Sequence, residues 1–215
     1  MILLNAIIEA DYKKRVTLFA GEQVNKDSIV LLGDSIIDYW PYKDYYQNDN
    51  IVNRGIAGDT SLGILNRLDQ IISLNPKAVI IHVGGNDLVR LKEDNDTDSI
   101  VKRILKIKYE LETNSNTKVY IVSLTPVLRG HNITNNTYMQ KRTNQMIDAI
   151  NDELSLFTKI IDVNSYLKDD KGNLKLEYTK DGLHLTKHGY DVFSYVIGKK
   201  VKELVFIKQW FFVMK

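Results

Sequence analysis

Short apolar runs alternate along this chain with segments of helical periodicity, and this alternation restricts the fold more than any other feature of the sequence. We expect strands at residues 28–33, 51–53, 78–83, 118–124 and 160–163, where β-branched and other apolar residues follow one another. Between these runs, apolar residues recur every three or four positions, as on the buried face of a helix. Repeated β-α-β units of this kind form a parallel sheet covered by helices on both sides.

The expected fold class is therefore α/β: a three-layer α/β/α sandwich with a five-stranded parallel sheet in flavodoxin-like order. An opening helix is expected at about residues 3–22, and Thr186 is a suitable N-cap for the last helix. Four apolar stripes mark the other helices: Leu62, Leu65, Leu68 and Ile72; Ile100, Ile104, Ile107 and Leu111; Met146, Ile150 and Leu154; and Tyr190, Phe193, Ile197, Val201 and Leu204. Because no repeat, composition break or proline-rich linker interrupts the pattern, we expect one domain over residues 1–215.

Charge and residue usage exclude several classes of function. Lysine and arginine number 29 against 27 aspartates and glutamates, a net charge of +2, which is too small an excess to drive binding to nucleic acid. The absence of cysteine excludes disulfide scaffolds, thiolate metal sites and cysteine nucleophiles. No apolar run is long enough to span a membrane, and the N-terminus lacks the basic region of a signal peptide, so a cytoplasmic location is expected. The apolar tail at about residues 204–215 is expected to cover the core, to form a homodimer or to touch a membrane surface, in that order.

Small and polar residues follow four of the expected strands. Because the carboxyl ends of parallel strands meet at one edge of a sheet, these clusters are expected to lie together, at the place where such folds bind ligands. The clusters are Gly33-Asp34-Ser35-Ile36, Arg54-Gly55-Ile56-Ala57-Gly58-Asp59-Thr60, Gly84-Gly85-Asn86-Asp87 and Asp181-Gly182-Leu183-His184-Leu185-Thr186.

Together the clusters supply what acyl transfer requires: a nucleophile, a base, a group that orients the base, and donors for the oxyanion. Asp181 and His184 are three residues apart, so the carboxylate can accept a hydrogen bond from one ring nitrogen while the other nitrogen faces Ser35. Each cluster by itself is a weak signal, since a lone Gly-Asp-Ser is more often a helix cap.

The four clusters occur in the order of the four sequence blocks of the SGNH (GDSL-type) hydrolases, and residues 28–200 resemble that family. The chain is similar in particular to the branch that contains the platelet-activating-factor acetylhydrolase catalytic subunits. The resemblance implies a catalytic triad of Ser35, Asp181 and His184. It also implies an oxyanion hole made by the backbone amides of Ser35 and Gly58 and by the side chain of Asn86. Ile36 and Gly85 depart from the residues common in the family, without removing any of these groups.

Other polar residues are assigned structural roles. Asp34, Asp59 and Asp87 are interpreted as turn and cap residues. Arg54 is interpreted as part of an ion pair and His82 as a core residue with satisfied hydrogen bonds.

A separate set of alternatives concerns the surroundings of the site. His184, His188 and Asp181 have a weak resemblance to a metal site, His131 is either solvated or at the border of the site, and Tyr39, Trp40 and Tyr42 either line a substrate cleft or pack on the sheet.

The expected function is that of a metal-independent serine esterase without a cofactor, which hydrolyses small esters through an acyl-enzyme. A short acyl group, most simply acetyl on a sugar or another polar alcohol, is the first choice. Two alternatives stay open: hydrolysis of lysophospholipids or thioesters, and a catalytically idle binding module with the same fold.

Overall fold

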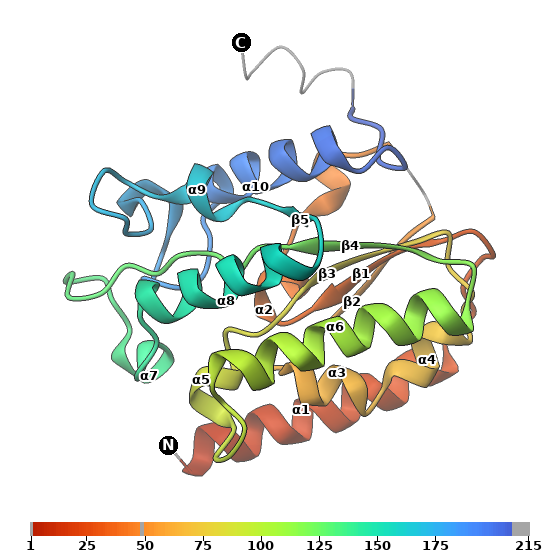
Figure 1. Ribbon diagram of the computed structural model, residues 1–215, viewed down its shortest axis with the longest axis horizontal. Helices are drawn as coiled ribbons and strands as arrows, with labels where there is room; N and C mark the ends of the chain where they lie inside the picture. The colour runs from red at the N-terminus through yellow and green to blue at the C-terminus, as the bar shows by residue number, and fades with distance from the viewer. Residues whose placement is uncertain (1, 48–49, 208–215) are drawn as a thin grey trace.

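A computed structural model describes residues 2–47 and 50–207 of the chain (Figure 1). At its centre lies a parallel sheet with the strand order β2-β1-β3-β4-β5, which confirms the predicted five-stranded α/β fold in flavodoxin-like order. The strands are β1 (Ile29–Gly33), β2 (Ile51–Gly55), β3 (Ala78–His82), β4 (Lys118–Val122) and β5 (Ile160–Ile161).

The register of β1 with its two neighbours, β2 and β3, brings the carboxyl ends of these three strands to one level. Gly33, the last residue of β1, lies opposite Gly55 of β2 and His82 of β3. A Cβ atom on Gly33 would lie 2.2 Å from the carbonyl oxygen of His82, so this close approach requires glycine. The segments that follow the three strands therefore start side by side at one edge of the sheet.

Helices cover both faces of the sheet (Figure 1). The longer ones are α1 (Ile2–Gly21), α6 (Thr97–Asn114), α8 (Asn144–Phe157) and α10 (Lys187–Lys200). The shorter ones are α2 (Ser35–Asp38), α3 (Ser61–Leu65), α4 (Leu68–Ile72), α5 (Asp87–Arg90), α7 (Asn136–Met139) and α9 (Asn164–Leu167), with single 3-10 turns at η1 (Tyr42–Asp44) and η2 (Leu176–Tyr178). Thr186 caps α10 as predicted, since its hydroxyl accepts a hydrogen bond from the amide of Gly189.

Two apolar cores lie on opposite faces of the sheet because successive strand residues point to opposite sides. Val30 and Leu32 of β1 face the core formed with α6 and α8. Ile29 and Leu31 face the core formed with α10, which also holds Trp40 and Tyr45. All five residues of β1 are buried, as expected for a central strand covered on both sides.

The stripe predicted between residues 62 and 72 is wrong in part. Two short helices, α3 and α4, stand where one was expected, and Leu62 is 43% exposed. Leu68 is buried as predicted, and Leu65 and Ile72 are partly buried against the same core. The other fully buried apolar residues are Ile64 and Ile71, which the predicted stripe did not include. The helix is interrupted at Arg67, whose φ of −125° is not helical and whose guanidinium turns back into the protein to bind Asp59.

The first helix, α1, lies along α3 and α4 (Figure 1) and agrees with the expected helix at about residues 3–22. The hydroxyl of Tyr12 donates to the carbonyl of Gly63, and Gln70 donates to the carbonyl of Val16. Within the described ranges, no helix is both long and apolar enough to cross a membrane.

The described part of the apolar tail packs beside the segment that precedes residue 48. Phe206 forms an antiparallel bridge with Tyr46, and the two rings lie 5.4 Å apart. Residues 204–207 therefore cover the aromatic side of the α10 core, the first of the three expected uses of the tail. The rest of the predicted tail, residues 208–215, lies outside the described residues.

Candidate active site

Ser35, His184 and Asp181 form a continuous chain of polar contacts at the carboxyl edge of the sheet. The Oγ atom of Ser35 lies 3.1 Å from Nε2 of His184, and Nδ1 of His184 lies 2.6 Å from Oδ2 of Asp181. An ionised carboxylate only accepts hydrogen bonds, so Nδ1 carries the ring proton when the imidazole is neutral. The lone pair of Nε2 then faces the Ser35 hydroxyl, which is the arrangement that allows a histidine to remove a proton from a serine.

Ser35 is positioned by the turn from β1 into α2. Asp34 is the N-cap of α2, and its Oδ1 accepts a hydrogen bond from the amide of Ile36 at 3.0 Å. The interpretation of Asp34 as a cap is confirmed. Ser35 is the first residue of the helix and is only 7% exposed, so its hydroxyl is held at a fixed place above the end of β1.

Asp181 and His184 are held together by a tight turn. Oδ1 of Asp181 accepts hydrogen bonds from the backbone amides of Leu183 and His184, at 3.0 and 2.7 Å. Gly182, between them, has a φ of +86°, and a Cβ atom there would lie 2.5 Å from the carbonyl oxygen of Leu128. Glycine at this position therefore allows the turn that brings the carboxylate under the imidazole.

The pKa of the Asp181 carboxyl reflects two opposing effects. Burial raises it, but the hydrogen bonds from the side chain and backbone of His184 outweigh burial and hold the pKa below its usual value. The carboxylate therefore stays ionised at neutral pH and can stabilise a protonated His184.

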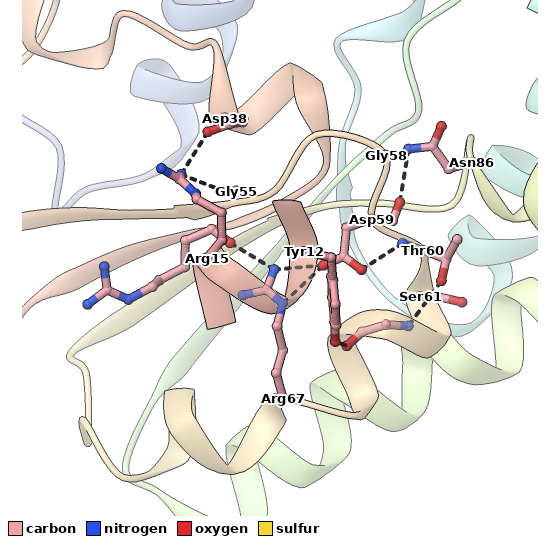
Figure 2. A network of polar contacts seen from close by, with 12 residues as sticks. Tyr12, Arg15, Asp38, Gly55, Gly58, Asp59, Thr60, Ser61, Arg67 and Asn86 are labelled. Carbon is pink, nitrogen blue, oxygen red and sulfur yellow. Dashed lines mark hydrogen bonds and ion pairs between the residues drawn. The ribbon is translucent and has the colours of Figure 1, made fainter. Parts of the chain in front are cut away.

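The loop after β2 carries Gly58 and is fixed by a buried polar network (Figure 2). Asp59 accepts two hydrogen bonds from Arg67, at 3.0 and 2.8 Å, and both side chains are almost fully buried. Arg67 also donates to the carbonyl of Arg54, which joins the loop to β2. Gly58 has a φ of +81°, and a Cβ atom on it would lie 2.5 Å from Arg90 and 2.6 Å from Ile8, so this position too requires glycine.

Asn86 lies at the start of α5, and its amide group has only one orientation compatible with its partners. Its Nδ2 donates to the carbonyl of Asp59 at 2.9 Å (Figure 2), and its Oδ1 accepts a hydrogen bond from the guanidinium of Arg142. A guanidinium has no acceptor, so the amide oxygen must face Arg142 and the nitrogen must face the loop after β2. Asn86 also lines the pocket in front of Ser35.

Arg142 connects three parts of the site. It donates to the carbonyl of Gly85 at 2.8 Å and also to the carbonyl of Tyr138. The residue is 4% exposed, and burial lowers its pKa to about 10, which leaves it charged at neutral pH. The charged guanidinium of Arg142 is therefore held against the amide oxygen of Asn86.

A pocket of about 310 Å³ opens in front of Ser35 and His184. Tyr39 and Tyr138 stand on two sides of the histidine, with ring centres 5.5 and 5.3 Å from the imidazole. The pocket is lined by Ile7, Ile8 and Asp11 of α1, by Ser35, Tyr39, Ala57, Gly58, Asn86, Val89 and Arg90, and by Thr137, Tyr138, Gln140, Arg142, Leu183 and His184.

The aromatic residues after Ser35 thus have different places. Tyr39 lines the pocket, whereas Trp40 is buried and donates to Ser194 through its ring nitrogen. Tyr42 packs against the α10 core and is not among the lining residues.

Several structural roles predicted from the sequence need correction. Asp59 is a buried ion-pair partner of Arg67, and Asp87 accepts hydrogen bonds from Ser61 of α3 and Arg103 of α6, so neither is merely a cap. His82 is buried as predicted, but neither ring nitrogen has a hydrogen-bond partner among the described residues. The expected satisfaction of its hydrogen bonds is therefore wrong.

Other roles agree with the prediction or stay undecided. Arg54 forms the predicted ion pair, at 2.7 Å from Glu22. His188 lies within α10, whereas His184 precedes that helix, and the described residues hold no cluster of three side chains suited to a metal. His131 is exposed and does not line the pocket.

Sequence analysis missed Arg90, Tyr138, Arg142 and the contribution of α1 to the pocket. Tyr138 and Arg142 belong to a polar stretch without periodicity, so no pattern marked them. The loop that leads to Tyr138 is attached to the turn between Asp181 and His184 by two backbone hydrogen bonds. The amide of Leu128 donates to the carbonyl of Gly182, and the amide of Asn135 donates to that of Asp181.

Comparison with known families and proteins gives a consistent result. Residues 31–192 match the GDSL-like Lipase/Acylhydrolase family. The chain is 32% identical over 183 residues to the N-acylneuraminate cytidylyltransferase of Escherichia coli O18:K1:H7, a match that covers 81% of this chain and 40% of that protein. It is 33% identical over 92 residues to the thioesterase 1/protease 1/lysophospholipase L1 of Escherichia coli K12, covering 37% of this chain and 44% of the relative. Each match thus spans less than half the length of the curated relative.

Solved structures share the whole fold. A candidate platelet activating factor from Streptococcus pneumonia superposes with a TM-score of 0.79 at 26% identity, covering 92% of this chain and 95% of the other. A GDSL-like lipase from Bacteroides thetaiotaomicron has a TM-score of 0.77 at 24% identity, covering 90% and 98%.

Proposed function

The chain belongs to the GDSL-like lipase/acylhydrolase family, and we propose that it is a serine esterase that uses Ser35, His184 and Asp181 to hydrolyse short-chain carboxylic esters, most simply acetyl esters. The observation that carries this proposal is the unbroken series of contacts from the Ser35 hydroxyl through the imidazole to the Asp181 carboxylate. A hydroxyl, a base and an orienting carboxylate in this order form an activated nucleophile.

In the first half of the reaction, Nε2 of His184 takes the proton of Ser35 as Oγ attacks the ester carbonyl. The carbonyl oxygen becomes an oxyanion, which the backbone amides of Ser35 and Gly58 and the Nδ2 group of Asn86 stabilise. The positive charge of Arg142 acts through the amide oxygen of Asn86, because it polarises the amide and fixes its direction. Collapse of the intermediate breaks the ester C–O bond, and His184 returns the proton to the departing alcohol.

In the second half, His184 removes a proton from water, and the resulting hydroxide attacks the acyl carbon on Ser35. The same donors stabilise the second oxyanion. Ser35 leaves with the proton from His184, and a carboxylic acid is released. Asp181 stays ionised throughout and stabilises the imidazolium each time it forms.

A short acyl chain is supported by the size of the pocket. A volume of about 310 Å³ is at the small end of the range for ligand sites, and it must hold both halves of the ester. A relative named after an N-acylneuraminate, an acylated sugar, agrees with a sugar or another polar alcohol as the second half. The relative named as a thioesterase and lysophospholipase keeps those two substrates as the alternative.

Replacing the nucleophile tests the proposal. Ser35→Ala removes one hydroxyl at the sheet edge and is expected to abolish turnover of soluble acetyl esters without lowering the melting temperature. Ser165→Ala is the matched control, because Ser165, like Ser35, lies in a short helix. Its exposed hydroxyl donates to Asp162, and the residue does not line the pocket. Hydrolysis by Ser35→Ala at the rate of the control would reject the proposal.

The same assay, extended to a graded set of substrates, separates the alternatives. A kcat/KM that falls as the acyl chain grows beyond a few carbons is the expected result. Faster hydrolysis of lysophospholipids or acyl thioesters would replace acetyl esters as the substrate, and binding of esters without turnover would point to the idle binding module.

A further inference from the structure

The arginines of the described chain fall into two groups that differ in their partners. Four of them pair with carboxylates: Arg15 with Asp38, Arg54 with Glu22, Arg67 with Asp59, and Arg103 with Asp87. Among residues 2–47 and 50–207, the other three, Arg90, Arg129 and Arg142, have no carboxylate oxygen within 4 Å. Of these, Arg90 and Arg142 line the pocket in front of Ser35, whereas Arg129 is exposed and bonds backbone carbonyls. The protein therefore leaves two cations without counter-ions at the site where the substrate binds.

The two arginines of the pocket that lack a carboxylate partner are not equivalent. Arg142 is buried, and each of its nitrogens donates to a protein oxygen: the carbonyl of Gly85, the carbonyl of Tyr138 or the side chain of Asn86. Arg90 is only half-buried, and within the part of the chain that the structure describes its guanidinium makes one hydrogen bond, from Nη1 to the carbonyl of Gly58 at 2.7 Å. A guanidinium has five N–H groups, so Arg90 keeps donors for a ligand whereas Arg142 is committed to the protein.

The acids near Arg90 do not neutralise it at close range. Glu9 is exposed and lies 3.4 Å from Lys13, and Asp59 is bound to Arg67. Asp11, the carboxylate that lines the pocket, is exposed on α1. Burial lowers the pKa of Arg90, while the negative charges of Asp59 and Glu9 oppose that shift. Arg90 therefore remains a cation that is partly removed from water, and an anion bound to it would face little competition from solvent.

Resting on the proposed esterase function, we propose that Arg90 is a specificity-determining residue and that the substrate carries an anionic group, a carboxylate or a phosphate, on its alcohol half. The acetyl half has no atom for such a group, so the anion must belong to the alcohol. Because Arg90 bonds the carbonyl of Gly58, whose amide is a proposed oxyanion donor, the anion lies a few atoms from the reacting carbonyl.

Four acetyl esters test this inference. O-acetyl-lactate and acetoxyethyl phosphate carry the two anionic groups, O-acetyl-lactamide is a neutral analogue of the first, and acetylcholine is cationic. Wild-type protein is expected to hydrolyse at least one anionic ester with a kcat/KM about tenfold or more above that of the neutral amide, the gain of a charge-assisted hydrogen bond, and acetylcholine with the lowest value. The comparison of carboxylate with phosphate identifies which anion the pocket takes.

Variants show whether Arg90 causes the preference. Arg90→Gln can still donate to Gly58 and is expected to raise KM for the anionic ester much more than for the neutral ester, until the preference disappears. Arg90→Lys keeps the charge and should retain part of the preference. Lys102→Gln is the matched control for net charge, since Lys102 is exposed on α6 and does not line the pocket. In wild-type protein the preference should also shrink as ionic strength rises from about 0.01 M to about 1 M.

Three results would overturn the inference: equal kcat/KM for anionic and neutral esters, a preference that survives Arg90→Gln, or an equal loss of kcat on all esters in that variant, which would mean that Arg90 only braces Gly58. Absence of Ser35-dependent hydrolysis of every ester would be a different failure, because it would reject the esterase function itself and the inference with it.

Discussion

Two polar side chains at the site, those of His184 and Asn86, are each held in one orientation by their hydrogen-bond partners. His184 lies between a hydroxyl and a carboxylate, and Asn86 lies between a guanidinium and a backbone carbonyl. Because these partners are fixed by the protein, the groups need little rearrangement when charge develops on the substrate. This is the physical reason for expecting single substitutions here to change the rate more than the stability.

The first prediction at this scale concerns Asn86. If Nδ2 stabilises the oxyanion, Asn86→Ala lowers kcat by about a hundredfold to a thousandfold and changes KM little, because the contact strengthens only in the transition state. The side chain of Asn86 makes no capping hydrogen bond to α5, so it does not serve mainly to brace the start of that helix. kcat per titrated active site, measured beside a melting curve, checks the prediction, and a lower melting temperature with an undiminished kcat would contradict it.

The second prediction concerns pH and Asp181. Its pKa is lower in the folded protein than in the unfolded chain, so its contribution to stability is complete above the unfolded value of about 3.9 and is lost as pH falls through the folded value. Asp181→Asn is therefore expected to be less stable than wild type at about pH 5, with a difference that narrows at lower pH. Urea denaturation of both proteins from about pH 5 to about pH 2.5 measures this, and a constant difference would contradict it.

At the scale of elements, the loop between β2 and α3 depends on one buried ion pair. Arg67 leaves the helical path, separates α3 from α4 and binds Asp59, while Tyr12 and Arg15 of α1 contact Gly63 and Gly55 (Figure 2). Burial raises the pKa of Asp59 to about 6 even though Arg67 opposes the shift, so the carboxylate depends on its partner to stay ionised. The position of Gly58 is thus determined by contacts made several residues away.

Removal of Arg67 tests this dependence. Arg67→Met leaves Asp59 buried and unpaired, which is expected to cost about 3–5 kcal/mol of unfolding free energy. Arg15→Met, in the more exposed pair with Asp38, is the matched control and should cost about 1 kcal/mol or less. Adding Asp59→Leu to Arg67→Met is expected to restore part of the stability. Equal losses for the two single variants in chemical denaturation would contradict the assigned role of the buried pair.

Helices could be predicted from the sequence where the apolar periodicity runs along one uninterrupted helix. The stripe of Ile100, Ile104, Ile107 and Leu111 is buried throughout, as expected. The prediction of one helix from Leu62 to Ile72 was wrong in part because the helix is interrupted at Arg67, which pairs with Asp59. Apolar periodicity carries no information about such an ion pair.

At the scale of the whole molecule, the sheet explains why the site could be anticipated. A parallel sheet with level strand ends brings segments after β1, β2 and β3 together, so Ser35, Gly58 and Asn86 meet although they are far apart in the chain. Arg90, Tyr138 and α1 complete the pocket through tertiary contacts that no spacing rule describes. The side of the pocket that we propose selects the substrate was therefore the part that needed the structure.

The measurement that tests the central claim most directly is titration of the protein with a fluorophosphonate ester followed by peptide mass analysis. A serine activated by His184 is expected to take up one phosphonyl group per chain, on Ser35 alone, and esterase activity should fall in proportion to the label. Asp181→Asn should slow this labelling, because His184 loses the carboxylate that orients it. Label on another residue, or full esterase activity in protein whose Ser35 is completely labelled, would contradict the assignment of Ser35 as the nucleophile.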